Sequence, residues 1–244
     1  MERKLDVGGT LSQVFSTYGS QAGVLLPLAF GLFLVVAVVN GLLAGNLVLV
    51  AVVILVDVVA ATLYQGMVVG LVSDVQDGRR DSTVGDLVRA TSPVILPLIG
   101  AGLLAGIGIG IGFILFVIPG LILLTIWSVI APAIVVERRG VIEAFSRSRE
   151  LVRDNGWQVF GVIFVVFVIA VVVQTVLGAI AAGIDDSALL RIVFNVLAQT
   201  ATAPITALTA AVIYFRLVAI KGEAAPAQTE PPAPPPPPAG TAPA

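Results

Sequence analysis

Asp57 is an acidic residue in the middle of a long apolar stretch, between Val56 and Val58. If this stretch crosses a membrane, an ionised carboxylate there costs about 3 kcal/mol or more unless it is paired, hydrated or protonated. Asp57 therefore either relays protons or cations, or is a neutral residue hydrogen-bonded to a polar neighbour. The candidate neighbours are Asn40, Gln65, Gln174, Thr175, Asn195 and Gln199. Asp57, Asn195 and Gln199 form the first candidate site.

Three arginines, Arg147, Arg149 and Arg153, form a second candidate site. Residues 141–152 have the pattern of an amphipathic helix that lies in the lipid headgroup layer, which makes these arginines candidate headgroup contacts. Ordinary anchoring by cytoplasmic cations explains the same residues. Glu143 precedes Arg147 by four residues, the order that favours a helical ion pair. The predicted apolar face contains Val141, Ile142, Phe145 and Val152.

The chain contains no histidine and no cysteine. This excludes thiolate and imidazole metal sites, the commonest general acid–base residue and the usual serine or cysteine triads. We therefore expect no catalytic residue, no metal and no cofactor. The formal net charge of -2 gives no basic excess for nucleic acid, so we expect no nucleic-acid partner.

A glycine-rich stretch follows residue 99. Its pairs Gly102/Gly106, Gly106/Gly110 and Gly108/Gly112 are each four residues apart, so small residues share one face of a helix. Such faces let helices approach closely in lipid. Close packing is one interpretation, and a flexible gating helix is the alternative. The stretch is no phosphate-binding loop, because the lysine and the flanking strand of such a loop are missing.

The composition assigns the chain to the membrane proteins. Of its 244 residues, 58% are hydrophobic and 11% are charged. A soluble domain has about 25% charged residues. With so little polar surface, the excess apolar surface must face lipid.

Apolar stretches of about 20 residues are long enough to cross a bilayer as helices. The chain has six of them, which predicts an all-α polytopic membrane protein with short amphipathic interfacial helices. We expect Pro119-Gly120 to form the turn between the third and fourth spans, with Ile118 biased towards extended geometry. The predicted spans are 22–43, 47–72, 93–117, 121–136, 157–182 and 189–218.

The lysines and arginines predict the orientation of these spans. With six crossings, the cations before the first span, in residues 73–92, in residues 137–156 and after the last span all fall on one side. Arg191 falls on the other side. The positive-inside rule places the cation-rich side, with both termini, in the cytoplasm. A merged or re-entrant pair of spans is the alternative topology.

The two ends of the chain differ from the membrane domain at residues 22–220. Residues 1–21 are predicted to be a cytoplasmic amphipathic segment. Residues 221–244 are rich in proline and alanine, which predicts a disordered cytoplasmic tail of extended, polyproline-like conformation. The alternative role of this tail is to dock in the aromatic groove of a protein partner.

A weak repeat runs through the chain, in which a short amphipathic segment precedes a hairpin of two spans. Leu25-Leu26-Pro27-Leu28 in the first unit is similar to Ile95-Leu96-Pro97-Leu98 in the second. Three such units would form a threefold repeat of helical hairpins, as internal repeats do in many membrane folds. Chance similarity between apolar segments is the alternative.

Residues 118–160 combine several short motifs: Pro119-Gly120, Ala131-Pro132-Ala133, Ala144-Phe145-Ser146-Arg147 and Asn155-Gly156-Trp157. This stretch resembles the membrane domain of glycerophosphoryl diester phosphodiesterases and related six-span prokaryotic membrane proteins. In those enzymes, hydrolysis belongs to a separate soluble domain with essential histidine and acidic residues. This chain has no histidine, so the resemblance implies no catalytic residue here.

Together, these observations predict a multi-pass protein of the prokaryotic inner membrane with no enzymatic activity of its own. The first functional hypothesis is a scaffold or accessory subunit that binds membrane lipid or a protein partner. The second is a small transporter or channel that uses Asp57 and polar residues of the fifth and sixth spans.

Overall fold

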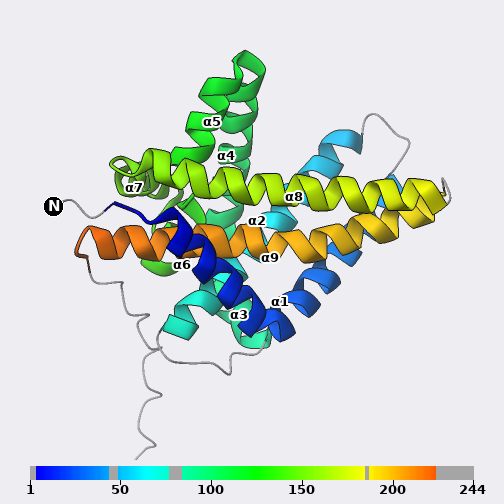
Figure 1. Ribbon diagram of the computed structural model, residues 1–244, viewed down its shortest axis with the longest axis horizontal. Helices are drawn as coiled ribbons and strands as arrows, with labels where there is room; N and C mark the ends of the chain where they lie inside the picture. Colours follow the sequence, from blue (N-terminus) through cyan, green and yellow to red (C-terminus); the bar gives the residue numbers. More distant parts are fainter. Residues whose placement is uncertain (1–3, 44–48, 77–83, 185–186, 224–244) are drawn as a thin grey trace, which may run out of the picture.

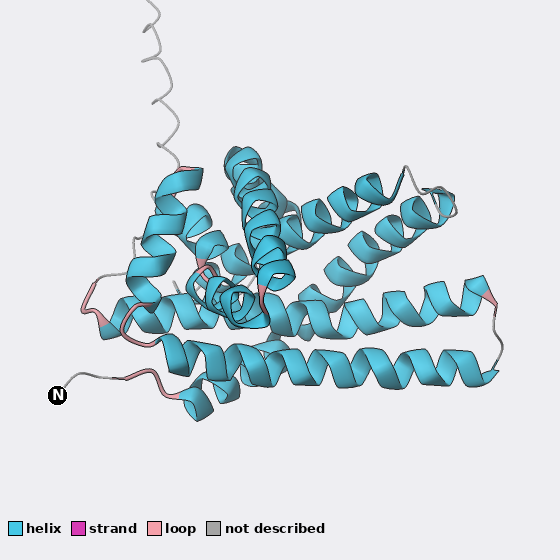
Figure 2. Ribbon diagram, turned by 90° about the horizontal axis from the view of Figure 1, so that it is seen from above, coloured by secondary structure: helices cyan, strands magenta, loops and turns pink. Residues whose placement is uncertain are grey.

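The computed structural model describes residues 4–43, 49–76, 84–184 and 187–223. Within these ranges every regular element is a helix, and short loops connect them (Figures 1 and 2). The helices are α1 (Val7–Leu43), α2 (Val50–Gln76), α3 (Val84–Thr91), a 3-10 turn (Ser92–Val94), α4 (Ile95–Leu115), α5 (Val117–Ile126), α6 (Ile130–Glu137), α7 (Val141–Val152), α8 (Gly156–Ile184) and α9 (Ala188–Ile220).

Six segments of this structure are long and apolar enough to span a membrane, which confirms the predicted all-α, multi-pass fold. Their bounds lie close to the predicted ones except at the starts of the first and third spans, which begin at Val7 and Gly85 instead of residues 22 and 93. They are Val7–Leu43, Val50–Gln76, Gly85–Leu115, Val117–Glu137, Gly156–Ile184 and Leu189–Ile220.

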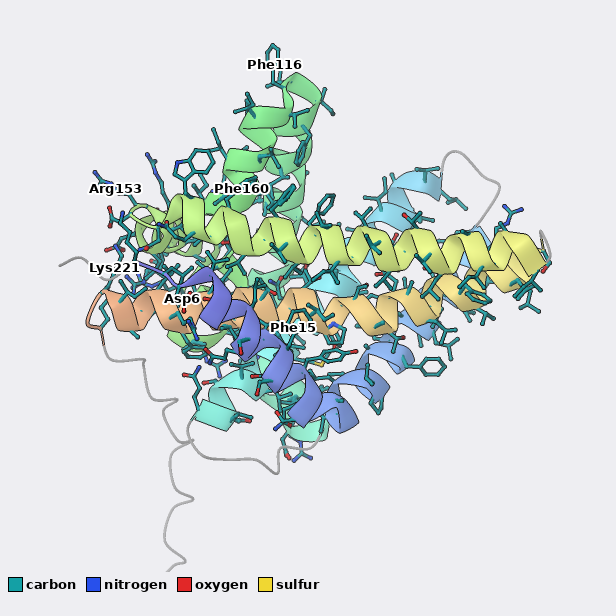
Figure 3. All side chains as sticks on the ribbon, viewed as in Figure 1. Asp6, Phe15, Phe116, Arg153, Phe160 and Lys221 are labelled. Carbon is teal, nitrogen blue, oxygen red and sulfur yellow. The ribbon has the colours of Figure 1, made fainter. Side chains whose placement is uncertain are left out.

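The spans form three hairpins, α1–α2, α4–α5 and α8–α9, as the repeat predicts. The most buried span is α9, which packs against α1, α2 and α8. The α4–α5 hairpin projects away from the α8–α9 pair (Figure 1). Its tip is fully apolar, with Ile114 85% and Phe116 75% exposed (Figure 3). Such exposed apolar side chains are stable only against lipid or another apolar surface.

The turn of the α4–α5 hairpin lies at Phe116, so the predicted turn at Pro119-Gly120 is wrong. Phe116 has extended backbone angles (φ -160°, ψ 149°), whereas Pro119 is the third residue of α5. A proline inside a helix removes one backbone hydrogen bond, and its ring clashes with the carbonyl of the residue four positions earlier. In the first turn of a helix neither effect matters, so proline is tolerated there. The break therefore occurs upstream of Pro119, and Ile118 is helical.

The fourth span consists of two helices, α5 and α6, joined by a turn at residues 127–129. Pro132, in the first turn of α6, explains the break in the same way. Ser148 of α7 satisfies the backbone there, because its hydroxyl donates to the carbonyl of Ile126 (2.7 Å) and accepts from the amide of Val129 (3.3 Å). Trp127, at the same turn, packs edge-to-face on Phe145 of α7 (centroid distance 4.9 Å).

The N-terminal amphipathic segment is continuous with the first span, so no boundary exists at residue 21. Helix α1 begins after Asp6, whose carbonyl accepts the Thr10 hydroxyl (2.5 Å), and it continues through Pro27 to Leu43. By contrast, α7 coincides with the predicted helix 141–152. The proline-rich tail from residue 224 lies outside the described residues.

The glycines of α4 differ in what they face. A side chain on Gly112 would meet the Cα of Gly120 at 3.0 Å, and one on Gly108 would meet the ring of Trp127 at 2.6 Å. Gly106 and Gly110 have nothing within 4 Å of such a side chain. Close packing therefore explains Gly108 and Gly112, whereas no described contact requires Gly106 or Gly110.

Candidate functional site

Asp57 is the eighth residue of α2, about 10 Å along the helix from its start. The side-chain amide of Asn40 on α1 donates a hydrogen bond of 2.8 Å to one carboxylate oxygen of Asp57. Asn40 is one of the candidate hydrogen-bond partners of Asp57 that were predicted from the sequence. The contact joins the two arms of the first hairpin.

The carboxylate of Asp57 also lines a cavity of about 400 Å³ between α1, α2, α8 and α9. Gln199 lines the same cavity, whereas Asn195, one turn earlier on α9, is exposed elsewhere. The structure therefore joins two of the three residues of the first candidate site. The polar residues around Asp57 in this cavity are Tyr64, Gln65, Gln174, Gln199, Thr202 and Thr206.

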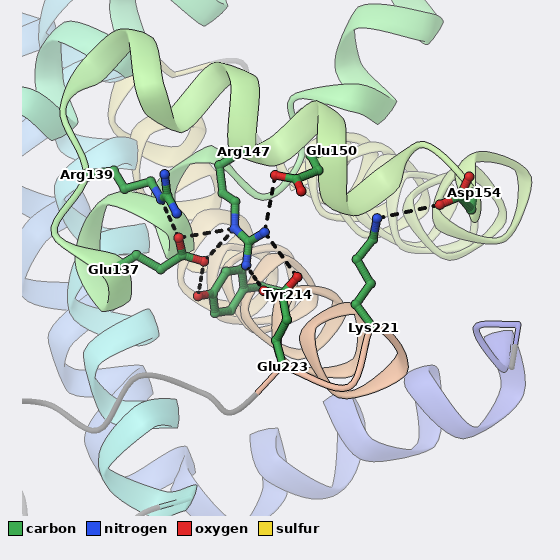
Figure 4. A network of polar contacts seen from close by, with 8 residues as sticks. All are labelled: Glu137, Arg139, Arg147, Glu150, Asp154, Tyr214, Lys221 and Glu223. Carbon is green, nitrogen blue, oxygen red and sulfur yellow. Dashed lines mark hydrogen bonds and ion pairs between the residues drawn. The ribbon is translucent and has the colours of Figure 1, made fainter.

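Arg147 is at the centre of a buried ion-pair network (Figure 4). Its guanidinium, 8% exposed, donates to both carboxylate oxygens of Glu137 at 2.8 and 3.1 Å and also pairs with Glu223. Glu150 accepts a longer contact of 3.3 Å. The Tyr214 hydroxyl donates to Glu137 at 2.8 Å. The network thus connects α6, α7, α9 and the chain directly after α9.

This network stabilises the charged form of Arg147. Hydrogen bonding to Glu223 and the interactions with Glu137 raise the pKa of the guanidinium above its ordinary value, against the opposing effect of burial. Arg147 is therefore a buried cation whose guanidinium is paired with carboxylates of this chain. The predicted pair with Glu143 does not form, because the guanidinium is directed to Glu137 and Glu223. Ile142, on the predicted apolar face of the interfacial helix, is 72% exposed.

Arg149 and Arg153, the other two predicted headgroup contacts, are exposed. Arg153 lines a groove of about 640 Å³ between α5 and the start of α8, and Lys4 lies at the same groove. Figure 3 shows Arg153 and Phe160 on the side of α8 from which the α4–α5 hairpin projects. The apolar wall of the groove contains Ile118, Leu121, Ile122, Ile126, Trp157 and Phe160.

Polar contacts join the residues before α1, the α7–α8 connection and the residue after α9 at one end of the molecule. Asp154 accepts from the ammonium of Lys4 through its carbonyl (3.4 Å) and pairs with Lys221 through its carboxylate (3.5 Å). The side chain of Asn155 accepts the backbone amide of Leu5 at 2.9 Å. Three of the four cation-rich segments that the sequence placed on one side, those at Lys4, Arg153 and Lys221, are therefore neighbours in space.

The comparisons with known proteins give one family. Residues 41–221 match a domain of unknown function, DUF7847, and the match covers more than half of the chain. The chain belongs to the DUF7847 family. No curated protein and no solved structure matches it. The DUF7847 region includes Asp57, Gln199 and the three arginines, but not Lys4, Asn40 or Glu223.

Within the DUF7847 region, Glu137 and Tyr214 are site residues that the sequence analysis missed. The spacing of Ala144, Ser148 and Leu151, small or apolar residues three and four positions apart, is the signal that marks the buried face next to Arg147. A buried arginine requires a carboxylate, and Glu137 ends the preceding apolar span. No group of three acidic, histidine or cysteine residues suited to a metal ion occurs among the described residues.

Proposed function

We propose that this protein is a non-catalytic accessory protein of the prokaryotic inner membrane that binds an anionic glycerophospholipid. The single observation that favours this function is the groove between α5 and the start of α8. The charged residues that line the groove are two cations, Lys4 and Arg153, and one acid, Asp154, and most of the remaining wall is apolar. This matches the polarity of a lipid, whose phosphate prefers cations and whose acyl chains prefer an apolar wall.

The position of the cations fits this proposal. The end of the molecule that contains Lys4, Arg153 and Lys221 faces the cytoplasm under the positive-inside rule. Trp157, 84% exposed beside the groove, has the amphipathic ring that favours the membrane interface. No described residue forms an ion pair or hydrogen bond with the Arg153 side chain, so the guanidinium is free to bind a phosphate.

The proposal includes no reaction, because the chain lacks the histidine that the phosphodiesterases resembled by residues 118–160 need for hydrolysis. The proline-rich tail after Gly222 remains a candidate docking strip for a protein partner. Co-purification of the full chain and of a chain truncated after Glu223 compares the proteins bound by each. Loss of a partner from the truncated chain supports docking, and identical sets exclude the tail from this role.

The lipid proposal is tested by native mass spectrometry of the protein after purification from mild detergent with added phosphatidylglycerol. Arg153→Gln removes one headgroup contact and should weaken lipid retention about fivefold. Arg149→Gln is the matched control, since Arg149 is exposed on α7 but does not line the groove. Equal retention by the two variants, or equal retention of phosphatidylcholine and phosphatidylglycerol by the parent protein, contradicts the proposal.

The cavity at Asp57 favours a second candidate function, the passage or binding of a small solute. Asp57 and Gln199 face a common space, whereas a purely structural Asp57 would be enclosed by side-chain hydrogen bonds. Abolished uptake of a proton-coupled solute in Asp57→Asn would support this function, and unchanged uptake would exclude a relay through Asp57.

A further inference from the structure

The cavity at Asp57 contains amide groups without partners. The side chains of Gln65, Gln174 and Gln199 line it, and none of them forms a hydrogen bond with any described residue. The threonine hydroxyls that line the cavity, unlike these amides, do have hydrogen-bond partners. Thr202 donates to the backbone carbonyl of Ala198 (2.8 Å), and Thr206 donates to that of Thr202 (3.2 Å). An unsatisfied polar group at membrane depth costs several kcal/mol. The three amides therefore require water or a solute in the cavity.

The charged and polar residues that line the cavity indicate which class of solute it would bind. Asp57 is its acidic residue, and no lysine or arginine lines it, so anions are disfavoured. A divalent metal ion prefers several carboxylate ligands, whereas Asp57 is accompanied by neutral amides and hydroxyls. The volume of about 400 Å³ lies within the range of pockets for small organic ligands. The aromatic side chains of Phe33 and Tyr64 add an apolar wall to one side.

From this geometry we infer that the cavity is a hydrated binding site for a small monovalent cation with hydrogen-bond donors, such as a primary ammonium. The carboxylate of Asp57 pairs with the charge, while Gln65, Gln174 and Gln199 accept its N–H groups. Asn40 fixes the orientation of the carboxylate through its 2.8 Å hydrogen bond. The inference rests on the second candidate function and is independent of the lipid groove, which contains other residues.

The absence of native cysteine allows a direct test with single-cysteine variants of the full chain in detergent. Gln199→Cys and Gln174→Cys are treated with 2-aminoethyl methanethiosulfonate, a primary ammonium, and with its sulfonatoethyl analogue, an anion. The ratio of the two rates is compared with that for free cysteine. Val172→Cys is the matched control, because Val172 lies on the same helix as Gln174 and is 54% exposed without lining the cavity.

The inference predicts that both cavity cysteines react, that Val172→Cys does not, and that the cationic reagent is favoured about tenfold. Adding Asp57→Asn, which preserves an acceptor for Asn40, should abolish the preference. If Asp57→Asn fails to fold, the preference in Gln199→Cys alone decides. Cavity cysteines as unreactive as Val172→Cys, or a preference equal to that of free cysteine, would overturn the inference. Neither result affects the lipid proposal, which depends on Arg153.

Discussion

Arg147 is one buried cation that pairs with carboxylates from separate parts of the chain. Glu137 ends α6, Glu150 lies one turn further along α7, and Glu223 follows α9. Removing the cation leaves Glu137, whose side chain is only 7% exposed, with Arg139 and the Tyr214 hydroxyl as its partners, and removes the buried partner of Glu223. Breaking a buried ion pair in this way is far more costly than the loss of an exposed one.

Arg147→Met should therefore lower the free energy of unfolding by about 3–5 kcal/mol, although methionine fills a similar volume. The loss is measurable by denaturant titration in detergent. Arg149→Met is the control, because Arg149 is exposed on the same helix and should change stability little. Equal losses in the two variants would show that the buried network does not stabilise the fold.

At the scale of residues, some side-chain partners could be predicted from the sequence and others could not. Asn40 was one of six candidate partners of Asp57, a short list because polar residues are rare in apolar stretches. The identity of the Arg147 partners was not recognisable, since Glu137 and Glu223 are 86 residues apart in the chain and meet only through the packing of α6 against α9. Local spacing instead suggested Glu143, which is exposed and forms no ion pair with Arg147 in the described structure.

At the scale of elements, the α4–α5 hairpin depends on glycine. Gly112 and Gly120 bring the two backbones into contact near the turn at Phe116. Between Ser92 and Thr125 the chain has no side chain that can form a hydrogen bond, so van der Waals packing joins these two helices.

Gly112→Val should separate α4 from α5 and destabilise the protein by about 1–3 kcal/mol, because the added side chain meets the backbone of Gly120. Gly106→Val provides the comparison, since Gly106 is exposed and has open space around it. Thermal unfolding in detergent distinguishes the two. A Gly106 variant as unstable as the Gly112 variant would contradict the assignment of the packing face.

Periodicity and length predicted each span and the interfacial helix α7, because both signals are local. The positions of the breaks were less predictable. Pro119 and Pro132 each lie in the first turn of a helix and displace the break to earlier residues, whereas Pro27 and Pro204 are accommodated inside α1 and α9. Which of these outcomes occurs depends on whether neighbouring groups, such as Ser148 at the α5–α6 turn, satisfy the freed backbone.

The described part of the molecule consists of three apolar hairpins, α1–α2, α4–α5 and α8–α9. The contacts of Asp154 with Lys4 and Lys221 bring the residue before α1, the α7–α8 connection and the residue after α9 together at one end. The lipid groove lies at this end, and the cavity at Asp57 lies between the hairpins α1–α2 and α8–α9. Both proposals require the helices to cross the membrane, and the lipid proposal also requires this end to face the cytoplasm.

The most direct test of this arrangement is cysteine labelling in intact cells, because the chain has no native cysteine. Gly140→Cys directly precedes α7, and Ser187→Cys lies in the connection between α8 and α9, one span further along the chain. A membrane-impermeant maleimide should label Ser187→Cys in intact cells and Gly140→Cys only after the membrane is opened. Labelling of Gly140→Cys in intact cells would contradict the account.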